Sequence, residues 1–308
     1  MKIVLLDALT LGDSDLSEFA TLGEFTRYDA TEPDQCLQHI ADNDIIITNK
    51  VVIDEAIISA NPQLKLICIA ATGMNNVDLV AAKKANVSVK NVSGYSTESV
   101  AQATFAMLFQ LLHQQRYYDH YVMEKKWCDS PNFTHISRPF TEIKSKRWGI
   151  IGLGGIGRRV AELATAFGCE VCYFSTSGQN NQADYQQVDF KTLLSQCDII
   201  TIHAPLNEQT QDLIDAQALA LLKPGAIMLN LGRGGIIDEQ AMAKSLDEQD
   251  IYHGSDVLAV EPMQKDHPYF DIKQQHRLVL TPHTAWASSE ARKSLVALVA
   301  ENIKAESI

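Results

Sequence analysis

Short apolar runs alternate with helix-like segments along the first third of the chain. The runs that predict strands lie at residues 2–6, 44–48, 64–70 and 87–91. Strands that alternate with helices are typical of a parallel sheet, because each parallel pair needs a crossover connection. The pattern therefore predicts an α/β domain at the beginning of the chain.

A long helix is predicted from Glu98 to Asp119, with Ser96 or Thr97 as its N-cap. Apolar side chains occupy nearly every side of it, at positions 100, 101, 105, 107, 108, 109, 111 and 112. A helix that is apolar nearly all round is buried on more than one side. We therefore expect this helix at a domain junction or in a subunit interface. Residues 132–146, further along, are expected to form a loop.

Six more strand-like runs predict a second α/β domain. They lie at 147–152, 170–175, 199–203, 226–231, 252–257 and 278–281. A final helix at 288–303 is expected to return to the first domain and make it discontinuous. The predicted boundaries are 1–97 plus 288–308 for the first domain and 98–287 for the second. Two domains are also what a length of 308 residues favours.

The net charge and the hydropathy of the chain restrict its partners. A formal charge of −12 argues against nucleic acid and anionic membranes, because both are bound by basic patches. The apolar run at the N-terminus ends at Asp7, which makes it too short for a signal peptide, and no other run is long enough to span a bilayer. A cytoplasmic protein without a membrane partner is therefore expected.

The positions of the cysteines do not predict a redox site. Cys169 and Cys172 form a C-x-x-C within a strand-like run, where a spacing of three points the two thiols to opposite faces. A redox motif would place them at the start of a helix instead. We expect reduced core cysteines. No metal site is expected either, because no set of His, Cys and carboxylate residues has the spacing of metal ligands.

A glycine motif, Gly152-Leu-Gly-Gly-Ile-Gly157, follows the strand-like run at 148–151 and opens an amphipathic helix. This is the context in which G-x-G-x-x-G binds a dinucleotide. Gly152 allows a tight turn, Gly154 lets a pyrophosphate approach the backbone, and Gly157 lets helix and strand pack closely. The phosphate charge then lies at the N-terminus of the helix. A glycine-rich turn that binds nothing is the simpler alternative.

The acidic residue that usually accompanies this glycine motif is missing. An acid that binds the adenine ribose is expected about 20 residues further on, where this chain has Ser175-Thr176-Ser177. No Arg or Lys stands there to bind a 2′-phosphate. NAD is the expected cofactor because no cation is present, and NADP stays open.

Three polar residues each follow a strand-like run of the second domain. Arg233, Glu261 and His283 come after the runs at 226–231, 252–257 and 278–281. Ligands of open α/β sheets bind at the carboxyl ends of the strands, so the three side chains can converge there. Reduction of a 2-keto acid needs a proton donor, for which an imidazolium held by a carboxylate is suited. A guanidinium can grip the substrate carboxylate and polarise its keto oxygen. Each residue could equally be an ordinary solvated or core side chain.

Taken together, these motifs resemble the D-2-hydroxy-acid dehydrogenase family. The resemblance runs through nearly the whole chain and rests on the glycine motif, on His203-Ala-Pro-Leu206, and on residues 230–237, 256–262 and 282–283. It implies an α/β protein with two doubly wound parallel-sheet domains. The second would be a Rossmann domain for NAD(P), and the first a flavodoxin-like substrate domain that closes over the nicotinamide by a hinge motion.

The resemblance also implies the site residues. The family's catalytic Arg, Glu and His match Arg233, Glu261 and His283, and its carboxyamide-binding Asp matches Asp256. The loop at 71–78 matches the family's substrate loop, in which Thr72, Gly73 and Met74 would hold the substrate carboxylate. The implied cofactor-binding residues are Thr104, Gly152, Gly154, Gly155, Ile156, Gly157, Ser175, Thr176, His203, Ala204, Pro205, Thr210, Leu231, Gly232 and Asp256.

Residues 94–105, residues 127–133 and Trp286 resemble one branch of the family, glycerate dehydrogenase (hydroxypyruvate reductase). Many relatives carry Glu where this chain has Gln102, and this branch commonly has Gln. The resemblance implies reduction of hydroxypyruvate or glyoxylate to D-glycerate or glycolate, and a homodimer with helix 98–119 in the interface. Two alternatives are a dehydrogenase for another 2-hydroxy acid and a non-catalytic NAD-sensing binding module.

Overall fold

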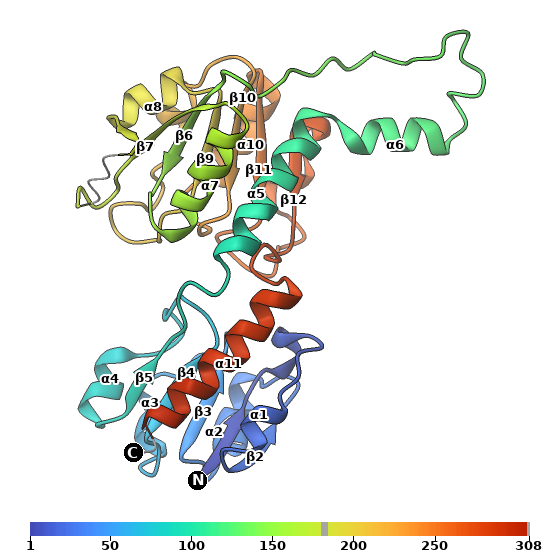
Figure 1. The fold of residues 1–308 in the computed structure, drawn as a ribbon. Coiled ribbons are helices and arrows are strands. Elements are labelled where there is room, and N and C mark those ends of the chain that lie inside the picture. The colour runs from blue at the N-terminus through green and yellow to red at the C-terminus, as the bar shows by residue number, and fades with distance from the viewer. Residues whose placement is uncertain (180–183, 307–308) are drawn as a thin grey trace. The chain divides into compact units, whose positions relative to one another are not determined.

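The computed structural model describes residues 1–179 and 184–306, which divide into two compact units. Unit 1 consists of residues 1–96 and 287–308, and unit 2 of residues 97–286. Figure 1 follows the chain through unit 1 in blue, then through unit 2, and back to unit 1 in red. The first unit is therefore built from both ends of the sequence.

Unit 1 contains a five-stranded sheet in its described part, with the strand order β2-β1-β3-β4-β5. Every neighbouring pair of strands is parallel. This is the flavodoxin-like order of a doubly wound fold. The strands are β1 (Lys2–Leu5), β2 (Glu24–Arg27), β3 (Ile45–Thr48), β4 (Leu66–Ile69) and β5 (Ser88–Lys90).

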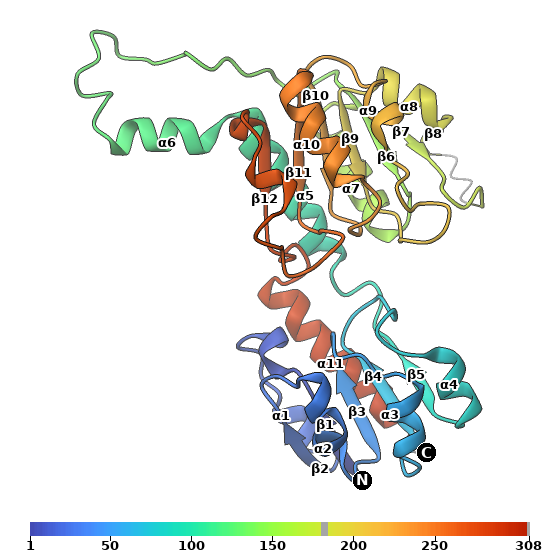
Figure 2. The ribbon, with the colours of Figure 1, turned by 180° about the vertical axis from the view of Figure 1, so that it is seen from behind.

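Helices cover both faces of this sheet. Helices α1 and α11 contact one another on one face, while α2, α3 and α4 form a chain of contacts on the other, and Figure 2 shows that second face. Apolar residues on α11, among them Leu295, Val299 and Ile303, are fully buried. The helices are α1 (Ser17–Ala20), α2 (Cys36–Ile40), α3 (Glu55–Ala60), α4 (Leu79–Lys84) and α11 (Ser289–Glu306), with the 3₁₀ turns η1 (Ala8–Leu11) and η2 (Pro33–Gln35).

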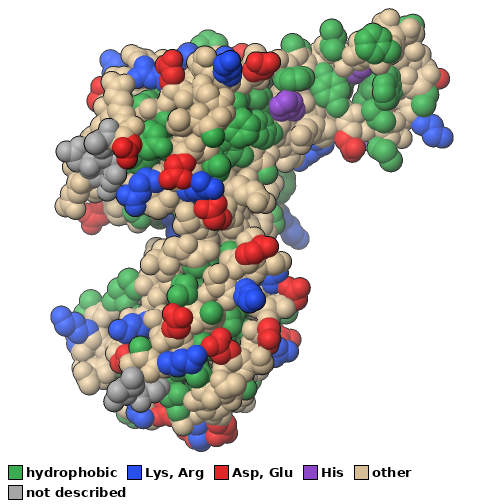
Figure 3. Space-filling view, in the orientation of Figure 1, with side chains coloured by type: hydrophobic (Ala, Val, Ile, Leu, Met, Phe, Trp, Pro, Cys, Tyr) green, Lys and Arg blue, Asp and Glu red, His purple; other side chains and the backbone are tan. Residues whose placement is uncertain are grey.

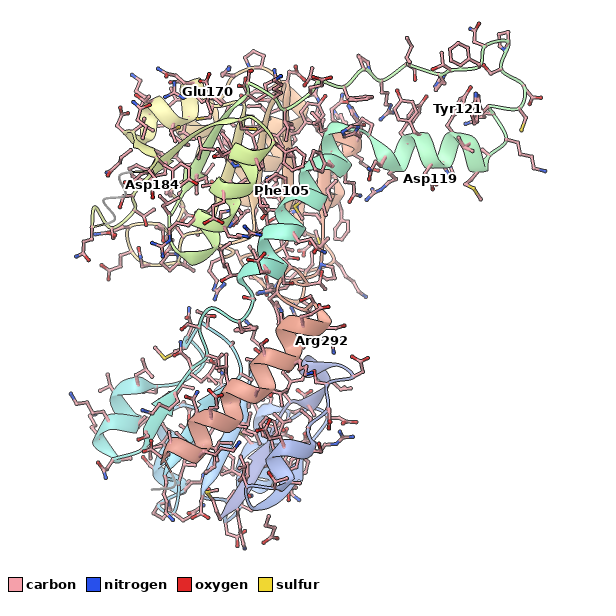
Figure 4. The ribbon with its side chains drawn as sticks, viewed as in Figure 1. Phe105, Asp119, Tyr121, Glu170, Asp184 and Arg292 are labelled. Atoms are coloured by element: carbon pink, nitrogen blue, oxygen red, sulfur yellow. The ribbon has the colours of Figure 1, made fainter. Side chains whose placement is uncertain are left out.

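Side-chain contacts tie α11 to the N-terminal part of unit 1. The guanidinium of Arg292, labelled in Figure 4, donates to the backbone oxygen of Leu11 at 3.0 Å and pairs with Asp13. Lys304 pairs with Glu18 at 2.9 Å near the other end of the helix. The final helix therefore packs against the N-terminal part of unit 1, to which both ends of the sequence belong.

Unit 2 contains a seven-stranded parallel sheet with the order β12-β11-β10-β9-β6-β7-β8 in its described part. Counted from its first strand, this is the Rossmann order 3-2-1-4-5-6 with one strand added. The strands are β6 (Arg147–Ile151), β7 (Glu170–Phe174), β8 (Gln186–Gln187), β9 (Ile199–Ile202), β10 (Ala226–Asn230), β11 (Ile251–Ser255) and β12 (Leu278–Leu280).

Two apolar clusters lie on the two faces of this sheet. One contains buried residues of α8, α9 and α10, and the other contains buried residues of α5 and α7 around Trp148 and Tyr173. Phe105 of α5, labelled in Figure 4, packs with its ring centroid 5.0 Å from that of Trp148. The helices are α5 (Thr97–Leu112), α7 (Gly155–Ala166), α8 (Phe190–Gln196), α9 (Ala216–Leu219) and α10 (Glu239–Glu248), with the turns η3 (Pro268–Phe270) and η4 (Gln275–Arg277).

The prediction of a single helix at 98–119 was wrong, because the structure has two helices there. Helix α5 ends at Leu112, and α6 (Gln115–Met123) begins after Gln114, which has a left-handed backbone with φ 51°. The Gln114 side chain donates to the backbone oxygens of Leu111 and His276, so it satisfies carbonyls at the helix end. Helix α5 is buried on several sides as expected, whereas α6 has no buried residue.

Most other elements agree with the pattern of the sequence. The predicted strands are present, with ends that differ by at most two residues, whereas β2 and the two-residue β8 were missed. Both are edge strands with few buried side chains, so they leave a weak apolar signal. Cys169 and Cys172 are buried as free thiols in different clusters on opposite faces, as expected. None of the described helices is both apolar and long enough for a membrane span.

Candidate active site

The glycine motif forms the turn between β6 and α7. Gly152 has φ 91°, a conformation that favours glycine, and an added Cβ would lie 2.9 Å from the backbone nitrogen of Ala204. A Cβ on Gly157 would lie 2.3 Å from the oxygen of Gly152, so only glycine lets helix and strand approach this closely. At Gly154 an added Cβ would meet nothing within 4 Å. The backbone there is open, as the predicted approach of a pyrophosphate requires.

The first turn of α7 presents backbone donors at this opening. Gly154 is the N-cap of this 12-residue helix and supplies no side-chain cap. The N–H groups of Gly155, Ile156 and Gly157 belong to the first turn, where no intrahelical acceptor is available. Donors at the positive end of a helix dipole favour an anion. The turn therefore fits the pyrophosphate of a dinucleotide.

Buried polar atoms of two side chains near this turn also fit a nucleotide. Strands β6 and β9 are neighbours at the point where the strand order reverses, and His203 follows β9 there. Neither ring nitrogen of His203 has a partner among the described residues, nor has the hydroxyl of Ser175 just after β7. Burial lowers the pKa of His203 to about 3, so its imidazole is neutral. Buried polar groups of native proteins are normally hydrogen-bonded, and NAD(P) could supply these bonds.

The remaining predicted cofactor residues lie on the loops that follow the strands, except Thr104 of α5 and Ile156 of α7. Ala204, Leu231 and Asp256 are buried, and Pro205 is exposed. The hydroxyls of Thr104 and Thr210 are buried and donate to the backbone oxygens of Val100 and Pro205. A Cβ on Gly232 would lie 2.9 Å from the oxygen of Ala204. Thr176 and Ile156 are partly exposed.

The structure brings Glu261 and His283 together. The strands that precede Arg233, Glu261 and His283 are the neighbours β10, β11 and β12, and their last residues Asn230, Ser255 and Leu280 are in register. Nδ1 of His283 lies 2.7 Å from Oε2 of Glu261. The two side chains are 25% and 34% exposed, so the pair is accessible to a substrate.

Asp256 fixes the turn that carries His283. Its Oδ1 accepts from the Thr281 hydroxyl and from the N–H of Thr284, and its Oδ2 accepts from the N–H of Ala285. His283 has a left-handed backbone with φ 54°, which costs a residue with a Cβ about 1–3 kcal/mol and persists only when its surroundings hold it. Burial raises the pKa of Asp256, while these donors oppose the shift.

Arg233 lies on a turn shaped by Asn230. The Asn230 side chain donates to the backbone oxygen of Arg233 and accepts from the N–H of Gly232. The guanidinium donates to the oxygen of Gly232 at 2.8 Å. An added Cβ on Gly234 would lie 1.9 Å from the oxygen of Leu258, so this turn packs directly against the segment that leads to Glu261.

The predicted substrate loop belongs to unit 1 and follows β4. The Thr72 hydroxyl donates to the oxygen of Val92, and the Asn91 side chain donates to the oxygen of Thr72. Thr72 is exposed, whereas Gly73 and Met74 are partly exposed, and Met74 packs against the apolar cluster of unit 1. Two hydrogen bonds at Thr72 thus hold this loop, and Gly73 and Met74 are partly accessible to solvent.

Two polar residues that the sequence did not predict lie close to the segment that leads to Glu261. Glu239 and His267 are hydrogen-bonded to each other at 2.9 Å, and Glu239 also binds the N–H of Ala259. Neither lies in a recognisable motif, so the sequence offers no signal for them. Within the described residues no group of His, Cys, Asp and Glu could hold a metal ion.

Comparison with known proteins assigns the chain to a family. Residues 105–285 match the family model described as D-isomer specific 2-hydroxyacid dehydrogenase, NAD binding domain. The chain belongs to this family. It is therefore an oxidoreductase that uses NAD(P) and acts on the CH–OH group of 2-hydroxy acids.

Full-length relatives agree with this assignment. A putative 2-hydroxyacid dehydrogenase from Haemophilus influenzae is 37% identical over 99% of this chain and 97% of its own length. A hydroxypyruvate reductase from Blautia hydrogenotrophica is 33% identical over 99% and 96%. Among solved structures, an acyclic imino acid reductase (Bsp5) in complex with NADPH and D-Arg has a TM-score of 0.88 and 31% identity, and the match covers 99% and 96% of the two chains. The family resemblance read from the motifs is confirmed.

The packing role of Gly157 and the proposed cofactor-binding role of Gly154 can be separated by substitution. Gly157→Ala should lower the free energy of unfolding of the cofactor-free protein by about 1–3 kcal/mol, because the methyl group overlaps a backbone oxygen. Gly154→Ala should leave that free energy nearly unchanged and weaken NADH and NADPH binding about tenfold or more, because the methyl group occupies the open side of the turn. Urea unfolding and fluorescence titration measure the two effects. Equal cofactor binding by wild type and Gly154→Ala would contradict the assignment of this turn.

Proposed function

We propose that this dehydrogenase reduces a small 2-keto acid, hydroxypyruvate or glyoxylate, to D-glycerate or glycolate. The observation that carries the proposal is the 2.7 Å contact between His283 and Glu261 at the carboxyl ends of neighbouring strands. A relative 33% identical over nearly the full length is a hydroxypyruvate reductase. That name supports the choice of substrate among the acids on which the family acts.

The geometry of the pair defines the path of the proton. Nδ1 of His283 donates to Glu261, which leaves Nε2 as the nitrogen that faces a substrate. The carboxylate accepts from Nδ1 and so fixes the orientation of the imidazole. In reduction, Nε2 gives its proton to the keto oxygen, and in oxidation the neutral imidazole takes the proton from the hydroxyl.

The remaining assignments are also proposals. NAD(P)H, when bound, supplies the hydride that adds to the keto carbon. Arg233 grips the substrate carboxylate and polarises the keto oxygen, since a planar guanidinium suits a carboxylate. Backbone groups of residues 72–74 bind the same carboxylate. Asp256 binds the carboxyamide of the cofactor and also holds the turn that carries His283.

The proton donor can be tested by mutation. His283→Ala should lower kcat for hydroxypyruvate by about 10²–10⁴-fold, because general acid catalysis contributes about that much. The Kd for NADH should change little. His39→Ala is a matched control, since His39 lies on α2 of unit 1, where its Nδ1 is 2.9 Å from the Thr31 hydroxyl, and it should keep wild-type kcat. Absorbance of NADH and NADPH with hydroxypyruvate, glyoxylate and pyruvate measures turnover. Wild-type kcat in His283→Ala would remove this residue from the mechanism, and no turnover with any acid would favour the binding module.

The choice between NAD and NADP depends on the end of β7. Among the described residues 175–179 there is no acid to bind the ribose hydroxyls and no cation to bind a 2′-phosphate. We propose that the protein prefers NAD modestly. Serine hydroxyls there can accept either nucleotide, because they neither repel nor neutralise a phosphate.

A carboxylate at this position should sharpen the preference. Ser175→Asp should raise the ratio of kcat/KM for NADH over NADPH about tenfold or more, because it accepts from the ribose hydroxyls and repels a 2′-phosphate. Ser177→Asp adds the same charge at an exposed position and should change the ratio much less. Steady-state kinetics with both cofactors measures the ratio, and equal ratios in both variants would contradict this placement of the ribose.

We further propose a homodimer through α5, α6 and the segment that follows to residue 142. Figure 3 shows hydrophobic side chains gathered over α6 and this segment. Exposed apolar residues there are Val122, Met123, Trp127, Phe133, Ile136 and Phe140. An apolar patch of this kind on a monomer is a mark of an interface. Inside the segment, Tyr121 stacks on His135 with ring centroids 3.9 Å apart, and Figure 4 shows Tyr121 and Asp119 on different sides of α6.

Polar substitutions in this segment should dissociate the dimer. Phe133→Ser combined with Ile136→Ser should shift the mass in solution from twice the 34.1 kDa of the chain toward one chain, because two exposed apolar anchors are lost. Phe270→Ser replaces an exposed phenylalanine of η3 and should leave the mass unchanged. Size-exclusion chromatography with light scattering measures the mass. A wild-type monomer would overturn the proposal.

A cytoplasmic location is also proposed. All six cysteines are free thiols, and five of them are buried. Free thiols are typical of proteins in a reducing compartment.

A further inference from the structure

We propose that Glu239 and His267 are positioning residues for the reaction, which hold the segment 258–261 so that Glu261 meets His283. This inference rests on the proposed function of the Glu261–His283 pair. Neither residue follows a strand end, and neither is among the residues that the family resemblance implies. They lie on α10 and at the N-cap of η3, next to the segment that carries Glu261.

Two carboxylates bind consecutive backbone N–H groups of this segment. Oε1 of Glu261 accepts from the N–H of Leu258 at 2.9 Å, and Oε1 of Glu239 accepts from the N–H of Ala259 at 2.7 Å. Oε2 of Glu261 faces His283. The carboxylate of Glu239 therefore fixes the backbone two residues before Glu261. Any shift of that backbone changes the distance on which the proton transfer depends.

His267 fixes Glu239 in turn. Nδ1 of His267 accepts from the N–H of Tyr269 at 3.2 Å, so Nε2 carries the proton and donates to Oε2 of Glu239 at 2.9 Å. The two side chains are only 8% and 15% exposed. A hydrogen bond to a charged group is stronger than one between neutral groups, and it is screened little when the pair is buried. This chain of bonds runs from η3 through α10 to the segment.

Packing alone does not hold the segment in place. The close contact between Gly234 and Leu258 supports one end of it. Residues 259 and 260 instead line a cavity of about 360 Å³ together with Glu239 and His267, and Val260 is 52% exposed. Because these two residues border open space, we expect their position to depend on the hydrogen bond to Glu239.

The experiment is a double-mutant cycle in the full-length protein with hydroxypyruvate as substrate. Glu239→Ala should lower kcat about 10–100-fold, because small displacements of a catalytic group cost that much, with little change in KM for the cofactor. Glu239→Gln keeps an oxygen for the N–H of Ala259 and should recover a large part of the loss. Glu248→Ala removes an exposed carboxylate from the same helix and should keep wild-type kcat.

The cycle tests whether Glu239 acts through Glu261. In a Glu261→Gln background, Glu239→Ala should lower kcat by a further factor of less than about two, because the effects of residues that act as a unit are not additive. Additive losses, or wild-type kcat in Glu239→Ala, would overturn the inference. If Glu239→Ala does not fold by circular dichroism, His267→Ala takes its place in the cycle, because it removes the donor that fixes Glu239. Wild-type kcat in His283→Ala measured alongside would instead overturn the proposed function, so the two failures are distinguishable.

Discussion

Parallel pairing of strands is the constraint on which this protein depends. In both units every pair of neighbouring named strands is parallel, so each chain segment must cross back through a helix or loop before the next strand starts. All strands of a sheet then end at the same edge. Residues as far apart in sequence as Gly152 and His283 reach one edge of unit 2 for this reason. The fold thus gathers polar loops without any of them being near in sequence.

Close backbone contacts hold the loops at this edge against one another. Gly152, Gly157, Gly232 and Gly234 each sit where an added Cβ would lie within 3 Å of another backbone atom. Glycine at these positions lets neighbouring loops touch through their main chains. The turn after β10 packs on the segment before Glu261, and the turn after β6 packs on Ala204. The loops at this edge are therefore in direct main-chain contact and do not pack independently of one another.

Buried carboxylates hold the loops in conformations that their own sequence does not favour. Asp256 binds three donors of the turn that carries His283, and His283 keeps a left-handed backbone as a result. Asp7 has the same role in unit 1, where it accepts from the N–H groups of Asn49 and Lys50 after β3. Burial raises the pKa of Asp7, because removal of a carboxylate from water is costly. In both cases this cost is offset by donors of a loop at the carboxyl edge of the sheet.

The sequence by itself determined the alternation of strands and helices, the glycine turn and the three polar residues that follow β10, β11 and β12. These are local patterns, since side-chain periodicity and glycine conformations act over a few residues. Only the tertiary structure decided that α5 ends at Leu112, because the partner that helps end it, His276, lies far along the chain. It likewise decided the edge strands and the contact between Glu239, His267 and the segment before Glu261. Such contacts join residues 20 or more positions apart, and no local pattern encodes a distance that arises only when the sheet is assembled.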